Sequence, residues 1–290
     1  MTDAFSRYHP AVNATWFALV LVGVVTSFHP ALLLIALGCG LAWSIQLGLH
    51  WRPLSLFALF LLAAVCNPLF THAGVTILCY FPNGNPLTLE SILFGLGAGG
   101  MLLTAAVLLR CGGAVLTADK WMCLMGRALP ILSLLLSMAL RFFPQTQRRL
   151  TQTTTAQRQA GQQGHTPLAR ARQVVRQISA LIFWSLEAAL TTADSMESRG
   201  YGLPGRTAYT NYRLEHRDRN ALGWLALLGG YLFLMALHGN LAWRYYPSLR
   251  WAPLDLWTVS ALADWAVLCA LPLYLNWKED RAWTCFDSKT

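Results

Sequence analysis

The stretch of sequence that decides the fold is ADSMESRGYG, which runs from Ala193 to Gly202. It closes a long polar interruption in an otherwise apolar chain. Arg199 is expected on the last turn of a helix, because Gly200 follows it at once and glycine commonly ends helices. No phosphate-binding loop of the GxxxxGK(S/T) type occurs in the chain. The stretch is therefore typical of a helix end that binds a partner protein.

Outside this interruption the composition indicates a membrane protein. Of the 290 residues, 55% are hydrophobic and only 12% are charged. Apolar stretches approach the roughly 20 residues that a helix needs to cross a bilayer. They are residues 11–28, 30–49, 54–70, 89–109, 222–237 and 256–275. We therefore expect an all-α polytopic membrane protein with about six transmembrane helices.

The fourth apolar stretch is rich in glycine, with Gly95, Gly97, Gly99 and Gly100. Small residues let the backbones of two helices approach closely in a membrane. We therefore expect this helix to pack tightly against a neighbour.

Residues 121–140 look like a further span, but Arg127 and Pro130 interrupt them. The remaining apolar run, residues 128–140, suits a buried or interfacial segment better than a crossing. The polar residues 145–163 that follow could form an unstructured linker. We prefer a helix that emerges from the membrane.

A long amphipathic helix is predicted over residues 168–198. Thr166 and Pro167 open it in the manner of an N-cap followed by a proline at the first helical position. Its apolar residues recur at helical spacing. They are Val175, Ile178, Ile182, Leu186, Ala189 and Ala193.

The positive charge is concentrated in the middle of the chain. The net charge is +9, and residues 111–219 hold fourteen basic and six acidic residues, a net of +8. Such a block indicates nucleic acid, anionic lipid or an acidic protein as a partner. Beside six membrane spans, nucleic acid is the weakest of the three, and we expect none. The composition divides the chain into a four-helix membrane part (1–110), a basic cytoplasmic part (111–219) and a two-helix membrane part (220–290).

The positive-inside rule sets the expected orientation. With a cytoplasmic N-terminus and six crossings, 20 basic residues lie inside and only Arg244 and Arg250 lie outside. Counting residues 121–140 as a seventh span would place the N-terminus outside and move Arg52 and Arg110 between faces. We therefore expect a multi-pass protein of the inner (plasma) membrane with a cytoplasmic N-terminus.

Metal and cofactor chemistry is not indicated. The seven cysteines are scattered, with no Cys-x-x-Cys and no Cys/His cluster of zinc spacing. Paired carboxylates and histidine clusters are also missing from the sequence. We therefore expect no catalytic residue, no bound metal and no cofactor.

Four motifs together resemble the transmembrane T component of energy-coupling factor (ECF) transporters, the CbiQ/EcfT-like subunits. The resemblance covers about residues 9–215. The motifs are Phe28-His29-Pro30, Arg141-Phe142-Phe143-Pro144, Ala156-Gln157-Arg158-Gln159-Ala160-Gly161 and Met196-Glu197-Ser198-Arg199-Gly200-Tyr201-Gly202.

The resemblance implies a non-catalytic, energy-coupling subunit of an ABC importer for a vitamin, a metal such as cobalt or another micronutrient. Its implied partners are two cytoplasmic ABC ATPase subunits, which would hydrolyse the ATP, and a small membrane S component, which would bind the substrate. It also implies a long cytoplasmic coupling-helix hairpin inserted after the fourth span, whose helices each end in an arginine motif that docks into one ATPase.

By this resemblance Arg199, with Ser198 and Gly200 beside it, forms the second ATPase-docking motif. Ser198 stands where the family usually has alanine.

The first docking motif comprises Arg158, Gln157 and Gly161. It departs further from the family, because the position just before Gly161, where arginine is expected, is Ala160. Arg158 lies two residues earlier, which is about 200° around a helix. The resemblance therefore implies two unequal ATPase contacts.

The alternative is a secondary transporter or channel that works alone. Such a protein needs polar or charged residues at mid-membrane on several spans, and often an internal repeat with broken helices. The sequence shows neither pattern. A membrane-bound enzyme is a weaker third class, because its catalytic motifs are missing from the sequence.

Overall fold

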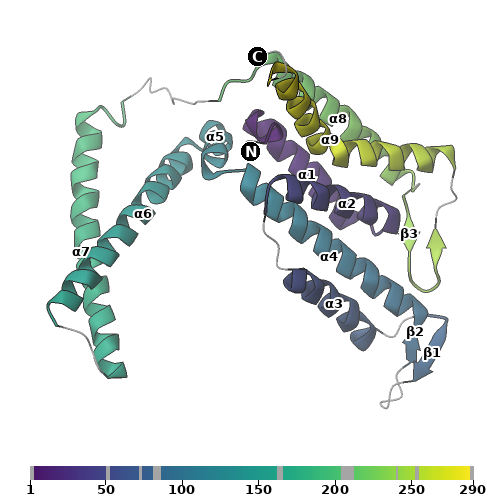
Figure 1. Ribbon diagram of the computed structural model, residues 1–290, viewed down its shortest axis with the longest axis horizontal. Coiled ribbons are helices and arrows are strands. Elements are labelled where there is room, and N and C mark those ends of the chain that lie inside the picture. The colour runs from purple at the N-terminus through teal and green to yellow at the C-terminus, as the bar shows by residue number, and fades with distance from the viewer. Residues whose placement is uncertain are drawn as a thin grey trace. The chain divides into compact units, whose positions relative to one another are not determined.

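The computed structural model describes residues 3–49, 53–71, 74–80, 86–161, 166–203, 212–239, 241–251 and 255–287. Within them the chain is predominantly helical (Figure 1). A short 3-10 helix at Phe5–Arg7 is followed by α1 (Pro10–Thr26), α2 (Pro30–Gln46), α3 (Pro53–Phe70), α4 (Leu89–Val115), α5 (Ala118–Ala128), α6 (Pro130–Gln159), α7 (Pro167–Ser198), α8 (His216–Leu237) and α9 (Leu256–Asp287).

Two short antiparallel β-hairpins interrupt the helical order, and the sequence analysis did not predict them. They are β1 (Ile77–Tyr80) with β2 (Pro86–Thr88), and β3 (Trp243–Arg244) with β4 (Arg250–Trp251). Each lies in a connection between two apolar helices. Strands of two to four residues are too short to show a period-2 pattern of hydrophobicity, which is the signal that identifies a strand.

The helices have the length and apolar composition of a membrane protein. Four of them are long and apolar enough to cross a bilayer, namely α4, α7, α8 and the Leu256–Glu279 part of α9. Three of the six predicted spans lie on α4, α8 and α9, and the other three lie on the shorter apolar helices α1, α2 and α3. The membrane class is therefore confirmed, whereas the six-span layout remains a prediction. α7, which we predicted to be cytoplasmic, is also long and apolar enough to cross, because apolar side chains outweigh charged ones over 18 of its consecutive residues.

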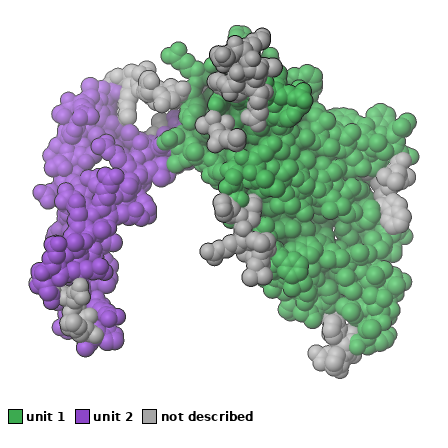
Figure 2. Space-filling view, viewed as in Figure 1, with its two compact units in different colours: residues 1–121, 212–290 green, residues 122–211 purple. Residues whose placement is uncertain are grey.

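The chain divides into two compact units (Figure 2). Unit 1 comprises Met1–Trp121 and Tyr212–Thr290, and unit 2 comprises Met122–Asn211. Unit 1 contains α1–α4, α8 and α9, together with the start of α5. Unit 2 contains the rest of α5 with α6 and α7.

An aromatic cluster forms the centre of unit 1. The ring of Trp16 lies edge-on to the rings of Trp43 and Phe5, with centroids 5.3 Å and 5.4 Å away. Phe17 stacks on Trp43 at 5.6 Å, and the Nε1–H of Trp16 donates to the backbone oxygen of Leu268 at 2.8 Å. The first three helical elements and α9 are thus held together by rings that are all buried.

Tight packing of the glycine-rich helix is confirmed, and α3 is its partner. A Cβ atom at Gly95 would lie 2.6 Å from the backbone oxygen of Ala64, and one at Gly99 would lie 2.9 Å from that of Phe60. Carbonyl groups of α3 therefore occupy the space that side chains on α4 would need. Gly100, by contrast, has open space where its Cβ would be.

These contacts predict opposite effects for two glycine substitutions on α4. Gly95→Ala forces the helices apart and is expected to lower the stability of unit 1 by about 1–3 kcal/mol, as overpacking does. Gly100→Ala should leave stability unchanged or raise it by up to about 1 kcal/mol, because alanine is the better helix former. Thermal unfolding of both variants in detergent measures the difference, and equal midpoints would contradict this packing.

Lys120 belongs to the predicted basic block, yet it is buried. Its side chain is only 4% exposed, and its ammonium donates to the backbone oxygen of Ser6 at 2.6 Å. Burial lowers the pKa of Lys120, while the charge of nearby Asp3 opposes that shift. Lys120 therefore fastens the start of α5 to the N-terminal residues of unit 1.

In unit 2 the predicted interruption of residues 121–140 is present. α5 ends at Ala128, Leu129 leaves the helical conformation, and Pro130 begins α6. α6 then continues through Pro144 to Gln159. Residues 145–159 are therefore helical, as preferred from the sequence, and not an unstructured linker. Residues 162–163 lie outside the described part of the chain.

Candidate functional site: two arginine-bearing helix ends

Helices α6 and α7 of unit 2 pack against each other as an antiparallel pair, here called the α6–α7 pair. Phe142 of α6 stacks on Trp184 of α7 with ring centroids 6.0 Å apart, and the guanidinium of Arg149 lies 4.8 Å from the centroid of a Trp184 ring. Further along α6, Gln157 meets residues earlier in α7. The order of these contacts shows that the helices run in opposite directions.

A glutamine cluster joins the two helices near the C-terminal end of α6. The side-chain oxygen of Gln157 accepts hydrogen bonds from Gln177 at 2.7 Å and from Gln173 at 3.2 Å. Gln177 is only 7% exposed, although most of the pair is exposed. A buried amide that loses its partner is destabilising, so this cluster fixes the register between the helices.

The sequence analysis missed this packing face of α7. It identified the apolar residues Val175, Ile178, Ile182 and Leu186 as the distinctive face, and the structure leaves all four exposed. The face toward α6 carries Gln173, Gln177 and Trp184 instead. The spacing of Gln173 and Gln177, one helical turn apart, was the signal available in the sequence. That Gln157 lies opposite them is seen only in the structure.

The second arginine motif ends α7 in a Schellman arrangement. The N–H of Tyr201 donates to the backbone oxygen of Met196 at 3.0 Å, and the N–H of Gly200 donates to that of Glu197 at 2.9 Å. Gly200 has φ +80°, which glycine adopts without the steric cost that a Cβ brings. These bonds satisfy carbonyl groups that the helix end would otherwise leave unpaired.

Arg199 is the last residue before this turn, and it is exposed. Its neighbour Ser198 donates its hydroxyl back to the backbone oxygen of Ser195 at 3.0 Å. Ser198 is thus engaged within the helix, whereas the guanidinium of Arg199 can reach outward. A cation at this position is also favoured by the negative end of the helix dipole.

The first arginine motif ends α6 with a similar turn. Ala160 caps the helix, and its N–H donates to the backbone oxygen of Ala156 at 3.0 Å. The N–H of Gly161 donates to the backbone oxygen of Arg158 at 3.1 Å, and Gly161 has φ +70°. Ala160 therefore occupies the cap position that Arg199 occupies in α7, in agreement with the mismatch noted in the sequence.

Two predicted docking residues of the first motif point in different directions. Gln157 is turned toward α7 by the glutamine cluster, while Arg158 is exposed. Adjacent helical residues differ by about 100° in direction, so Arg158 lies outside the face that contacts α7. The structure gives Gln157 a role in joining the two helices.

Gln157→Ala is expected to loosen the α6–α7 pair by about 1–3 kcal/mol, because it leaves the buried amide of Gln177 without its acceptor. Gln159→Ala is the matched control, because Gln159 is exposed and belongs to the same helix end. Hydrogen exchange of the backbone amides of residues 173–184 measures the effect. Equal exchange in the two variants would show that the cluster does not hold the pair together.

Comparisons with known proteins give one partial likeness. No family model matches the chain. A stretch of 110 residues is 33% identical to the energy-coupling factor transporter transmembrane protein EcfT of Lactobacillus helveticus (strain DPC 4571). The stretch is 37% of this chain and spans 40% of that relative's length. The chain is therefore similar, over part of its length, to the transmembrane component of an energy-coupling factor transporter.

Proposed function

We propose that this chain is the energy-coupling transmembrane subunit of an ECF-type ABC importer in the plasma (inner) membrane. The observation that carries the proposal is the end of α7, where an exposed arginine stands directly before a glycine with positive φ. The partial likeness to EcfT and the long apolar helices α4, α8 and α9 of unit 1 support it.

The proposed partners are two cytoplasmic ABC ATPase subunits and a small membrane S component. The chain itself is non-catalytic, and ATP is hydrolysed by the partners. Residues 111–219 form the cytoplasmic coupling part between the membrane parts 1–110 and 220–290, and the N-terminus is cytoplasmic. The S component holds the substrate, which belongs to the vitamins, metals or other micronutrients.

Arg199 supplies the main docking contact. Its planar guanidinium can bind a carboxylate of an ATPase through two parallel hydrogen bonds. The turn made by Gly200 carries the chain away from the helix end, and Ser198 is small enough to leave the guanidinium accessible. α7 has 32 residues, so it is a rod about 48 Å long that can carry a movement of the ATPase toward the membrane.

The second docking contact is weaker. Arg158 lies before the turn at Gly161, but it sits two residues earlier than the cap position that Arg199 holds in α7. Gln157 binds α7 and thereby couples the two helices, so a movement at one docking site reaches the other. The two ATPase contacts are accordingly unequal in this proposal.

Transport by purified components tests this function against a stand-alone secondary transporter or channel. The chain is reconstituted in liposomes with its co-purified subunits or by itself, and uptake is followed with and without ATP. Uptake that requires both the other subunits and ATP supports the proposal. Uptake by the chain alone without ATP would overturn it in favour of the secondary transporter or channel.

A further inference from the structure

Charge is distributed unevenly along unit 2. Residues 122–186 contain eight arginines and no lysine, aspartate or glutamate. The acidic residues of unit 2 all follow this segment, at Glu187, Asp194 and Glu197. The docking residue Arg199 lies in the part that contains acids, whereas most of the arginines lie at the other end of α7 and along α6. The arginine-rich part of unit 2 is therefore separate from the docking residue Arg199.

The outward face of α7 begins with arginine and continues with apolar side chains. Steps of seven residues lead from Arg176 to Phe183 and Leu190, which places these three on one side of the helix. Phe183 is 74% exposed and Leu190 is 68% exposed. Gln177 and Trp184 lie about 100° further round, and they face α6.

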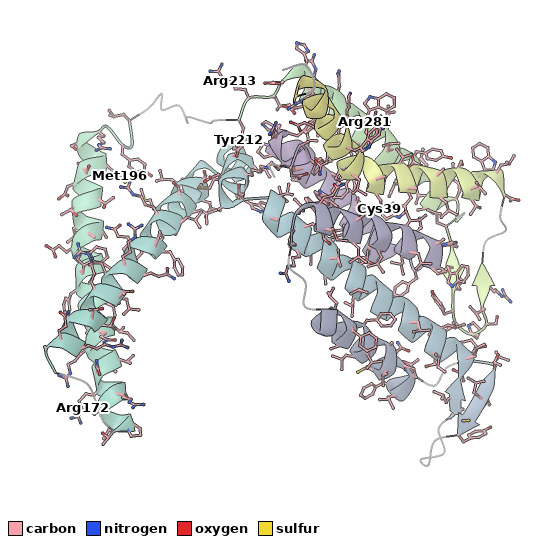
Figure 3. All side chains as sticks on the ribbon, in the orientation of Figure 1. Cys39, Arg172, Met196, Tyr212, Arg213 and Arg281 are labelled. Atoms are coloured by element: carbon pink, nitrogen blue, oxygen red, sulfur yellow. The ribbon has the colours of Figure 1, made fainter. Side chains whose placement is uncertain are left out.

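The basic part of this face lies toward the N-terminal end of α7, where Figure 3 shows Arg172, with Met196 toward the other end. The contact of Gln157 with Gln177 brings the C-terminal end of α6 to the same end of the α6–α7 pair. Exposed Arg148 lies further back along α6, next to Arg149, which contacts Trp184 near the middle of α7. Exposed Arg172 and Arg176 thus lie toward one end of α7, exposed Arg148 of α6 lies beside its middle, and apolar side chains continue along α7.

We propose that this surface, made of Arg148, Arg172, Arg176, Phe183 and Leu190, binds the anionic phospholipid headgroups of the bilayer. Guanidinium groups bind phosphate through two parallel hydrogen bonds, which lysine cannot do. A helix with arginines followed by a large aliphatic and aromatic stripe lies in the interfacial layer, with its apolar side chains among the acyl chains. The inference does not depend on the proposed function, because it concerns neither Arg199 nor an ATPase.

Two further observations favour a membrane over other negatively charged partners. Nucleic acid offers no apolar layer for Phe183 and Leu190. Unit 2 is, in contrast, covalently tied to a membrane helix, because only two residues separate α5 from α4, a helix long and apolar enough to cross the bilayer. Such a tether gives the lipid surface a high effective concentration.

An interfacial position also suits α7 better than a crossing does. If α7 spanned the bilayer, its partner α6 would bring Arg148 and Arg149 with it, and charged side chains in the hydrocarbon region are costly. At the interface the same arginines reach the headgroups, and the polar face of α6 remains in water.

Hydrogen exchange of the full-length chain, without other subunits, tests this proposal. The chain is placed in nanodiscs of phosphatidylcholine alone or with about 30% phosphatidylglycerol, and exchange is measured over residues 145–160 and 167–180. We expect roughly tenfold slower exchange in the anionic discs, with the difference shrinking at high salt because the charges are screened.

Two paired variants make the test specific. Arg172→Gln with Arg176→Gln should remove most of the lipid-dependent protection. Arg244→Gln with Arg250→Gln, which removes the same charge from β3 and β4, should keep it. Equal exchange in both lipid mixtures would overturn the proposal. So would protection that arises in phosphatidylcholine discs on adding inorganic phosphate or an acidic protein, since the site would then belong to that ligand.

Discussion

Replacing Arg199 with glutamate is expected to abolish the association of this chain with the proposed cytoplasmic ATPase subunits while membrane insertion is preserved. The substitution places a negative charge where a carboxylate of the partner is expected, and truncating or reversing one member of a buried charged pair costs about 2–5 kcal/mol or more. That cost corresponds to a loss of affinity of roughly thirtyfold to several thousandfold. The measurement is the amount of ATPase that co-purifies with the tagged chain in mild detergent.

Two companion variants show whether the guanidinium itself is the docking group. Arg199→Lys keeps the charge but not the planar fork, so it should retain part of the ATPase. Ala160→Arg places an arginine at the equivalent cap position of α6. The double variant Arg158→Ala with Ala160→Arg should therefore retain more ATPase than Arg158→Ala alone. An intact complex with Arg199→Glu would show that the docking assignment is wrong.

Trp16→Ala is expected to lower the stability of unit 1 by about 3–5 kcal/mol, which is the usual cost of removing a large aromatic residue from a core. Trp16 is only 1% exposed. Its loss removes ring contacts with Phe5, Phe17 and Trp43 and leaves the carbonyl of Leu268 without its indole donor.

Trp16→Phe separates these two contributions. It keeps most of the ring contacts and loses the hydrogen bond, so we expect a smaller loss of about 1–3 kcal/mol. Thermal unfolding in detergent gives both values. A Trp16→Ala protein as stable as the unchanged chain would contradict the placement of this cluster at the centre of unit 1.

The ends of the helices in unit 2 could be predicted from the sequence because they depend on local chemistry. Thr166 accepts a hydrogen bond from the N–H of Ala169 at 3.3 Å, which confirms the predicted N-cap of α7. The helix begins at Pro167 and ends at Ser198, directly before the turn at Gly200. Proline at the first position and glycine just past the end act through their own backbone geometry, so no tertiary contact is needed to find them.

The packing of these helices could not be predicted in the same way. Hydrophobic periodicity identifies the apolar face of α7, but it does not show whether another helix, a partner or lipid covers that face. The contact with α6 is made by Gln177 and Trp184 instead. Likewise the charge count placed Lys120 in the basic block, and only the tertiary structure shows that it is buried against Ser6.

The docking residues themselves were predicted from a resemblance and not from local chemistry. Local chemistry predicts only that an arginine before a glycine ends a helix, so the docking role came from the resemblance. What the structure adds is that Arg199 and Ala160 occupy the same cap position in two similar turns. The two turns differ in that the cap residue is arginine in α7 and alanine in α6. Exchanging these residues therefore tests whether the two ATPase contacts are unequal.

The most direct test of the proposed coupling role is affinity purification of this chain from its native membrane in mild detergent, with identification of the proteins that elute with it. The proposal predicts two ATPase subunits with phosphate-binding loops, together with a small hydrophobic membrane subunit. A chain that elutes alone and carries a substrate across liposome membranes without ATP would contradict it.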